Sequence, residues 1–90
     1  KKFMKPVTLV DQPLCPFCKK ALGYLEELQR QEPYSRIEIR MIDELAEPEV
    51  ADRYDYYYVP TFYVGDKKVH EGGIMPDEVE AVLRMALDER

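Results

Sequence analysis

Hydrophobic residues recur with two different periods along this chain, and each period predicts its own kind of element. The compact run PVTLVD, residues 6–11, is rich in β-branched residues and is typical of a buried strand. The run SRIEIRMID, residues 35–43, alternates polar and apolar residues, which predicts a second strand. In this second strand we expect Ile37, Ile39 and Met41 to share one side.

Three further segments repeat their apolar residues at spacings of three and four, which predicts helices with one buried face. We expect these helices at about residues 16–31, 44–54 and 76–88, and we expect the second to be interrupted or initiated at Pro48. Pro76 suits the first position of the third helix, whereas Met75 before it is a poor N-cap.

The segment VPTFYVGDKKVHEGG, residues 59–73, predicts a hairpin with strands over 61–64 and 68–71 and a turn at Gly65-Asp66. The order strand, helix, strand, helix, hairpin, helix predicts an α/β fold. In this fold a four-stranded mixed sheet (β-α-β-α-β-β-α) is flanked by three helices, because a parallel strand pair needs a crossover helix. The chain shows no repeat or linker, so we expect one domain over residues 1–90.

Composition and charge narrow the function classes. The chain is 46% hydrophobic and 34% charged, as a packed globular protein is, and its formal net charge is −5. Lysines and arginines occur at most in pairs, which argues against a nucleic-acid surface. No apolar stretch approaches the roughly 18 residues that a membrane span needs. We expect a cytoplasmic monomer that binds neither nucleic acid nor membranes.

The only two cysteines, Cys15 and Cys18, lie three residues apart in LCPFCKKAL, where the first helix is expected to start. If Pro16 is the first helical residue, Cys15 occupies the N-cap, where unpaired backbone N–H groups stabilise a sulfur anion. Such sites lower a cysteine pKa from about 8.5 to roughly 3.5–7.5. Lys19 and Lys20 add a smaller effect that solvent screens. Cys15 is thus the candidate nucleophile, and Cys18, one turn further on, is the candidate resolving thiol.

Two other interpretations of the pair carry less weight. Half of a zinc site is possible in principle, but only His70 remains as a further soft ligand, and a closed structural site usually takes four Cys or His ligands. Two inert, buried cysteines would not require a proline between them at a strand-to-helix junction. We therefore expect redox chemistry and no metal.

With the motif placed at this junction, the sequence resembles glutaredoxins and the wider thioredoxin family over nearly its whole length. CPFCKKA is similar to the Cys-Pro-Tyr-Cys pattern of dithiol glutaredoxins, and YYYVPTFYVGDKKVHEGG, residues 56–73, is similar to their second signature. The resemblance implies a thioredoxin-like fold and thiol-disulfide exchange. It also implies a cis bond at Pro60 facing the cysteines, main-chain hydrogen bonds from Val59 to a bound peptide or glutathione, and a glycine pair at Gly72 and Gly73.

The resemblance identifies Cys15 and Cys18 as catalytic, with Pro16 and Lys19 in support. Substrate or glutathione contacts are expected from a larger group drawn from both signatures: Gln12, Phe17, Tyr58, Val59, Pro60, Gly72 and Gly73.

Three departures concern glutathione. Gln12 stands where glutathione-using members commonly carry Lys, and Tyr58 stands where they carry Thr. Ile74, Met75 and Pro76 follow the glycine pair where they have an acidic pair. Losing the Lys removes a charge partner for a glutathione carboxylate. The tyrosine spacing before Pro60 also resembles thioredoxins, but their Trp-Cys-Gly-Pro-Cys site is absent.

The sequence thus predicts a dithiol-disulfide oxidoreductase that reduces protein or glutathione mixed disulfides. It would hold no permanent cofactor and would use glutathione, or a disulfide reductase, as the source of electrons. One alternative is a thioredoxin-like reductant recharged by a flavoprotein reductase, and another is a redox-inert or iron-sulfur-carrying binding domain.

Several other side chains have expected positions or roles. We expect Tyr54 and Tyr56 to pack in the core, Tyr58 to be a candidate for the groove beside Cys15, and His70 to be an exposed hairpin residue. The resemblance to thioredoxins, which have an acid on the same strand, makes Asp11 at the end of the first strand a candidate to take the Cys18 proton. The acidic residues after the second strand are expected to form a solvated face: Asp43, Glu44, Glu47 and Glu49.

Overall fold

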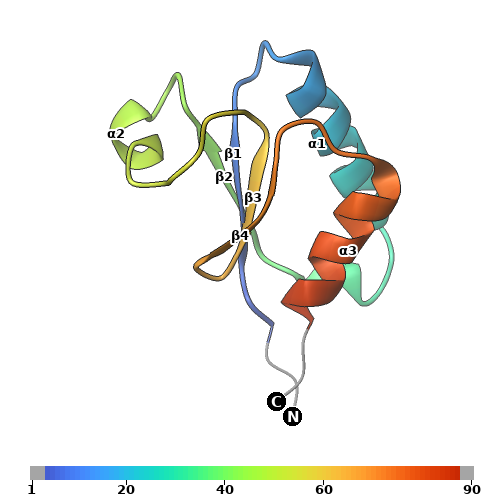
Figure 1. Ribbon diagram of the computed structural model, residues 1–90. Coiled ribbons are helices and arrows are strands. Elements are labelled where there is room, and N and C mark those ends of the chain that lie inside the picture. The colour runs from blue at the N-terminus through green and yellow to red at the C-terminus, as the bar shows by residue number, and fades with distance from the viewer. Residues whose placement is uncertain (1–3, 88–90) are drawn as a thin grey trace.

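The computed structural model describes residues 4–87, which form a four-stranded sheet with helices on both faces (Figure 1). The strands are β1 (Val7–Asp11), β2 (Ile39–Asp43), β3 (Thr61–Val64) and β4 (Lys67–Glu71). The helices are α1 (Pro16–Leu28), α2 (Pro48–Ala51) and α3 (Pro76–Ala86), with a 3-10 turn at Tyr34–Arg36. The predicted element order and mixed α/β sheet are confirmed.

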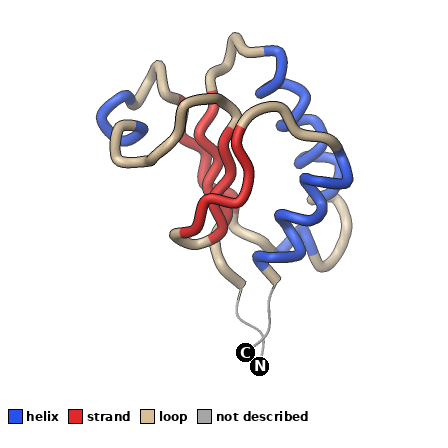
Figure 2. Tube along the Cα trace, in the orientation of Figure 1, coloured by secondary structure: helices blue, strands red, loops and turns tan. Residues whose placement is uncertain are grey.

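The sheet has the strand order β2-β1-β3-β4, and Figure 2 shows the strands gathered between the helices. Strand β1 pairs with β2 in parallel, because α1 carries the chain back between them, and it pairs with β3 in the antiparallel sense. All five residues of β1 are buried, as its continuous apolar run predicts. The predicted hairpin forms, with β3 at the predicted residues, β4 beginning one residue earlier than predicted, and Gly65 at a φ of 60° in the turn.

The core has one layer on each face of the sheet. Helices α1 and α3 cover one face, where buried residues of both helices pack against Val7, Leu9 and Phe62. The other face carries a smaller cluster around Val10 and Tyr63. Tyr54 and Tyr56 pack against this smaller cluster, and the rings of Tyr54 and Tyr63 lie 5.0 Å apart. The core assignment of these two tyrosines is confirmed.

The second strand is shorter than predicted, and the apolar residues on its predicted side differ in burial. Strand β2 begins at Ile39, because a 3-10 turn occupies the residues before it. Ile37 and Ile39 pack against the larger core cluster as expected, but Met41 is 47% exposed. Ile42 on the opposite face is buried. Since β2 is an edge strand of a sheet covered on both faces, simple alternation does not identify its buried side.

The second helix is a single turn instead of the predicted segment 44–54, and it begins at Pro48, where the sequence predicts a break or a start. The Asp43 carboxylate accepts the backbone N–H groups of Leu45 (2.9 Å) and Ala46 (3.2 Å), so the chain after β2 forms a turn first. Short acidic side chains commonly compete with helix formation in this way. Helix α1 likewise ends at Leu28, before the predicted limit at Gln31.

The start of the third helix is capped by a side chain from within the helix. Helix α3 begins at Pro76 as predicted, and its predicted end at Asp88 lies outside the described residues. The Glu78 carboxylate accepts the backbone N–H of Met75 at 2.9 Å. Glu78 thus supplies the reciprocal half of a capping box, so the helix start does not depend on a polar side chain at the N-cap.

Candidate active site

The loop after β1 leads directly to Cys15. The Cys15 backbone N–H donates to the carbonyl of Gln12 at 3.0 Å, and Cys15 itself has the extended conformation of an N-cap (φ −82°, ψ 123°). Pro16 is the first residue of α1. Cys15 therefore lies at the N-cap, as predicted, and its side chain is partly exposed.

The helix start favours the thiolate form of Cys15. The backbone N–H of Cys18 has the largest effect in lowering the pKa of Cys15, and the N–H of Phe17 and the thiol of Cys18 act in the same direction. Neither N–H makes a full capping hydrogen bond to the sulfur. Partial desolvation and the negative charge of Glu44 oppose the effect, and the net shift is downward.

Cys18 has the opposite environment. It is fully buried, and the backbone N–H of Gln12 donates to its sulfur at 3.4 Å. Burial raises the pKa of Cys18 to about 12, and its hydrogen bond to Cys15 and the negative charges of Cys15 and Asp11 add to this effect. The two thiols are therefore differentiated: at neutral pH Cys18 keeps its proton, while Cys15 gives up its own more readily.

The second signature lies at the same end of the sheet as Cys15. Val10 at the end of β1 pairs with Thr61 at the start of β3, so the loop before β3 lies beside the loop that carries Cys15. The Val59–Pro60 peptide bond is cis, as the resemblance implied. Residues 12–17 and residues 59–61 thus meet at one end of the molecule.

The glycine pair closes this end of the site. The Gly72 backbone N–H donates to the Pro60 carbonyl at 2.8 Å. A Cβ at Gly73 would lie 3.4 Å from the Phe17 ring, an ordinary contact distance, so the glycine pair lies beside that ring. The rings of Phe17 and Tyr58 are exposed (56% and 71%), which makes both available to a ligand.

Two further residues of the predicted site, Gln12 and Lys19, have other surroundings. The Gln12 side-chain amide donates to Glu44 at 2.9 Å, and the Tyr56 hydroxyl donates to the other oxygen of Glu44 at 2.6 Å. Lys19 is exposed on α1. The expectation that Glu44 belongs to a solvated face is wrong, because Glu44 is half-buried and joins two elements.

Asp11 and His70 differ from ordinary surface residues. Asp11 is only 4% exposed, and burial raises its pKa, with the negative charges of Asp43 and Glu44 adding to the shift. His70 is half-buried, not exposed as predicted, and its Nε2 lies 2.8 Å from the Gly73 carbonyl oxygen.

Sequence reasoning missed Glu71. Its carboxylate accepts the backbone N–H groups of Tyr57 and Tyr58, directly before the cis bond. No motif marks this residue. The only signal was its position beside the glycine pair at the end of the predicted hairpin.

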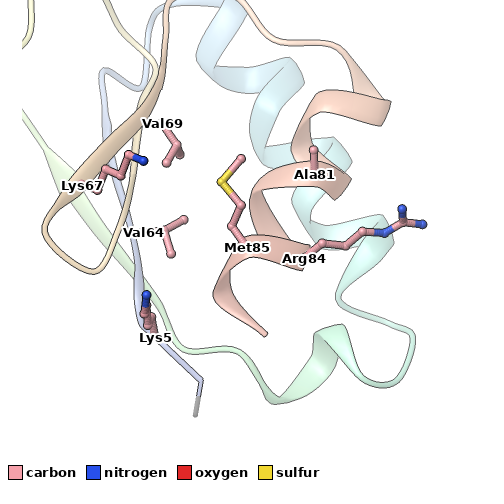
Figure 3. A pocket seen from close by; sticks show the side chains of 7 residues that line it. All are labelled: Lys5, Val64, Lys67, Val69, Ala81, Arg84 and Met85. Carbon is pink, nitrogen blue, oxygen red and sulfur yellow. The ribbon is translucent and has the colours of Figure 1, made fainter. Parts of the chain in front are cut away.

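Other features lie outside this site. A pocket of about 520 Å³ lies between α3 and the hairpin, and Figure 3 shows its lining of apolar and basic side chains. None of the predicted site residues lines it. Across residues 4–87, no three His, Cys, Asp or Glu side chains are grouped to hold a metal ion. Within the same range, no helix combines the length and apolar character needed to cross a membrane.

Solved structures of thioredoxins are similar to this chain. Desulfothioredoxin from Desulfovibrio vulgaris Hildenborough, in its reduced form, has 25% identity and a TM-score of 0.67 over 92% of this chain and 82% of its own. The oxidised thioredoxin from Plasmodium falciparum has 17% identity and a TM-score of 0.73, with 96% and 84% covered. Thioredoxin O1 from Arabidopsis thaliana has 17% identity and a TM-score of 0.71, with 94% and 79% covered. The fold is therefore thioredoxin-like.

Sequence comparison gives the family. No curated protein sequence matches this chain. The glutaredoxin family model matches residues 3–69, which include both cysteines and the cis-proline. Family and fold together support thiol-disulfide oxidoreductase chemistry in general. By this match, the chain belongs to the glutaredoxin family.

Proposed function

We propose that the protein is a dithiol-disulfide oxidoreductase that reduces protein or glutathione mixed disulfides through Cys15 and Cys18. One observation carries this proposal: two thiols one helical turn apart have opposite environments. Cys15 is partly exposed with a lowered pKa, and Cys18 is buried with a pKa raised to about 12. A nucleophile must be ionised and accessible, whereas a resolving thiol must stay protonated until it is needed.

The reaction proceeds by two exchanges. The Cys15 thiolate attacks one sulfur of the substrate disulfide, which forms a mixed disulfide and releases the other substrate sulfur as a thiolate that takes a proton from water. Cys18 then loses its proton and attacks the Cys15 sulfur, which releases the second substrate thiolate. The substrate gains two electrons, and the protein is left with a Cys15–Cys18 disulfide. Buried Asp11, with its raised pKa, is the nearby candidate to accept the Cys18 proton.

Substrate would bind across the two signatures. The main chain of Val59 would pair with the backbone of a bound peptide or glutathione, beside Pro60. Phe17 and Tyr58 would contact its side chains, and the glycines at 72 and 73 would give it room. Pro16 starts the helix at Cys15, and Lys19 adds a positive charge near it. The position of these segments at one end of the sheet supports this assignment.

Two electron donors fit the site, and one contact separates them. Glutathione is the donor that the family suggests, and two molecules would return the disulfide to the dithiol. In the alternative, the protein is itself a thioredoxin-like reductant, and a flavoprotein reductase recharges it. The bond from Gln12 to Glu44 favours this second candidate, because it places a carboxylate where a lysine would attract a glutathione carboxylate.

The proposed setting follows from this chemistry. A dithiol reductant works in a compartment that keeps thiols reduced, so we propose that the protein is cytoplasmic. We also propose that it is a monomer. Its partners would be disulfide-containing proteins and its electron donor, with no permanently bound cofactor and no nucleic acid. The acidic net charge of −5 agrees with the last point.

Turnover of a disulfide substrate tests the proposed function. The oxidised protein is assayed with glutathione and its reductase, and in parallel with thioredoxin reductase, by NADPH consumption. Cys15→Ser should abolish turnover with both donors, and Cys18→Ser should accumulate a mixed disulfide that mass spectrometry detects. Anaerobic incubation with iron and sulfide should give no coloured dimer. The proposal would be contradicted if the wild-type protein were inactive with both donors, or if the pKa of Cys15 were about 8.5.

A further inference from the structure

Strand β4 carries one residue more than its partner. The register of β3 with β4 shifts between Phe62 and Tyr63, which leaves Val69 without a partner on β3. In a regular strand, residues three apart point to opposite faces, and the extra residue of a bulge changes that alternation. Lys68 and Glu71 therefore lie on the same face of the sheet. Their side chains form an ion pair, with Lys68 Nζ 2.9 Å from Glu71 Oε1.

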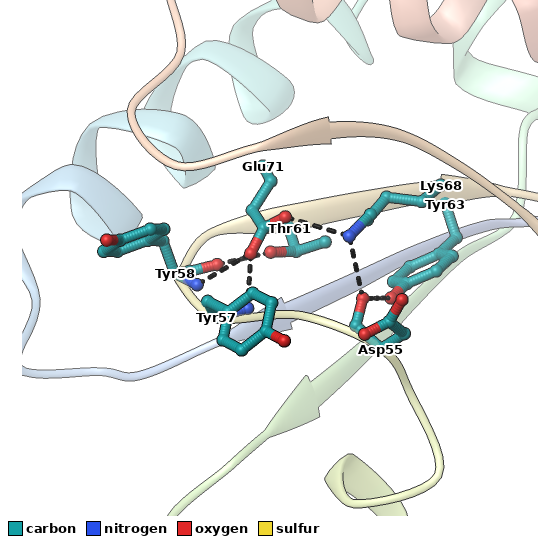
Figure 4. A network of polar contacts seen from close by, with 7 residues as sticks. All are labelled: Asp55, Tyr57, Tyr58, Thr61, Tyr63, Lys68 and Glu71. Carbon is teal, nitrogen blue, oxygen red and sulfur yellow. Dashed lines mark hydrogen bonds and ion pairs between the residues drawn. The ribbon is translucent and has the colours of Figure 1, made fainter.

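This ion pair holds the backbone of the loop before β3, as Figure 4 shows. Glu71 Oε2 accepts the backbone N–H of Tyr58 at 2.9 Å and also that of Tyr57. Lys68 donates to the carbonyl of Asp55 at 3.1 Å. Both ends of the segment 55–58 are thus bound by charged side chains of one edge strand.

The ion pair is better protected than an ordinary surface pair. The side chains of Lys68 and Glu71 are 33% and 20% exposed, whereas no side chain in the other ion pairs described for residues 4–87 is less than 36% exposed. Water and salt therefore screen this pair less. The N–H of Tyr57 is the largest cause that lowers the pKa of Glu71 to about 2, followed by Lys68 and the N–H of Tyr58. Glu71 is ionised at any physiological pH.

The contacts of this loop leave the Val59 backbone free for a ligand. The Tyr58 carbonyl accepts the Thr61 hydroxyl, and the Pro60 carbonyl accepts the Gly72 N–H. Within residues 4–87, no hydrogen-bond partner is present for the N–H or the carbonyl of Val59 between them. Since its neighbours on both sides are fixed, the Val59 peptide groups are held in one orientation for an incoming backbone.

We infer that Lys68 and Glu71 are positioning residues that orient the Val59 backbone for substrate. This inference rests on the proposed function, because it assigns these residues to the binding step of the same reaction. They act through the loop and touch neither sulfur. Orienting a binding backbone in advance reduces the ordering cost of association. Losing either residue should therefore weaken substrate binding and leave the reactivity of Cys15 unchanged.

The test compares Glu71→Ala, Glu71→Gln and Lys68→Met with the wild type, using a peptide with an internal disulfide as substrate and dithiothreitol as reductant. Glu71→Ala should raise KM about tenfold while kcat changes less than about twofold. Glu71→Gln, which keeps an acceptor oxygen, and Lys68→Met should give smaller rises. Amide exchange at Tyr57 and Tyr58 should become about tenfold faster in Glu71→Ala. The thiolate absorbance of Cys15 against pH should match the wild type.

Glu38→Gln is the matched control, because it removes an ion pair with Arg40 on the other edge strand. Its KM and amide exchange should equal those of the wild type. An unchanged KM in Glu71→Ala, or an equal rise in Glu38→Gln, would overturn the inference. If Glu71→Ala fails to fold, Glu71→Gln and Lys68→Met decide by the same readouts. An inactive wild type would defeat the proposed function, and amide exchange would still report whether Glu71 holds the loop.

Discussion

At the scale of single residues, Glu44 opposes the effect of the helix start on the pKa of Cys15. Its carboxylate bonds to Gln12 and Tyr56 and raises the pKa of Cys15, while the N–H groups of α1 lower it. The pKa of Cys15 thus results from opposed contributions. The largest comes from the helix backbone and is present in any sequence that starts a helix there. Burial of the sulfur is the main opposing effect, and the charge of Glu44 is a smaller one that depends on a single side chain.

We predict that Glu44→Gln lowers the pKa of Cys15, because it removes a nearby negative charge and keeps the size of the side chain. Absorbance of the thiolate against pH measures this shift, and reaction with iodoacetamide should become faster at pH values below the wild-type midpoint. Glu47→Gln, at an exposed position in the following turn, is the control and should leave the titration unchanged. A Cys15 pKa that stays the same or rises in Glu44→Gln would contradict this account.

At the scale of elements, helix α1 contains a residue that its position does not require. Gly23 is exposed in the middle of the helix, and no atom beyond its neighbours lies within 4 Å of an added Cβ. Gly23→Ala should therefore raise the free energy of unfolding by about 0.5–1 kcal/mol, because alanine loses less backbone entropy. Thermal unfolding should show a Tm higher by roughly 2–8 °C.

Gly65 provides the contrasting substitution for this measurement. It has a φ of 60° in the hairpin turn, a conformation that strains an L side chain. Gly65→Ala should lower the Tm, while Gly23→Ala raises it. A fall in both variants would mean that Gly23 has a packing role that the structure does not show.

The elements were predicted correctly where residues close together in the sequence determine the structure. The buried run of β1, the Gly65 turn and the start of α1 at Pro16 are set by local residues. The errors fall where a distant contact decides. The burial of Met41 and Ile42 depends on which helix covers each face of β2. The short second helix has a local cause instead, because the Asp43 carboxylate binds the backbone directly after β2.

The candidate site divides in the same way. The N-cap position of Cys15 and the burial of Cys18 follow from the helix pattern. Glu71 could not be found, because its contact with the loop depends on the bulge at Val69, two residues before it on the same strand. A strand pattern does not reveal an extra residue unless the register with the partner strand is known.

At the scale of the whole molecule, two carboxyl groups should shape the dependence of stability on pH in opposite ways. Burial raises the pKa of Asp11 above its model-compound value of 3.8. Its charged form therefore opposes folding, and the free energy of unfolding falls as pH rises from 3.8 through the folded pKa. Asp11→Asn should be more stable than the wild type at pH 7 in urea unfolding of the reduced protein. A less stable variant would show that the Asp11 charge supports the fold.

Glu71 should act in the reverse sense. Its pKa is lowered from 4.5 to about 2, so its charge stabilises the folded state above pH 4.5, and that contribution is lost as pH falls from 4.5 to 2. Glu71→Gln should therefore be less stable than the wild type at pH 7, and the difference should shrink as the pH approaches 2. Urea unfolding at several pH values measures both proteins, with Glu38→Gln as the control for a more exposed ion pair. A difference that is constant across this range would show that Glu71 stabilises the fold by its shape and not by its charge.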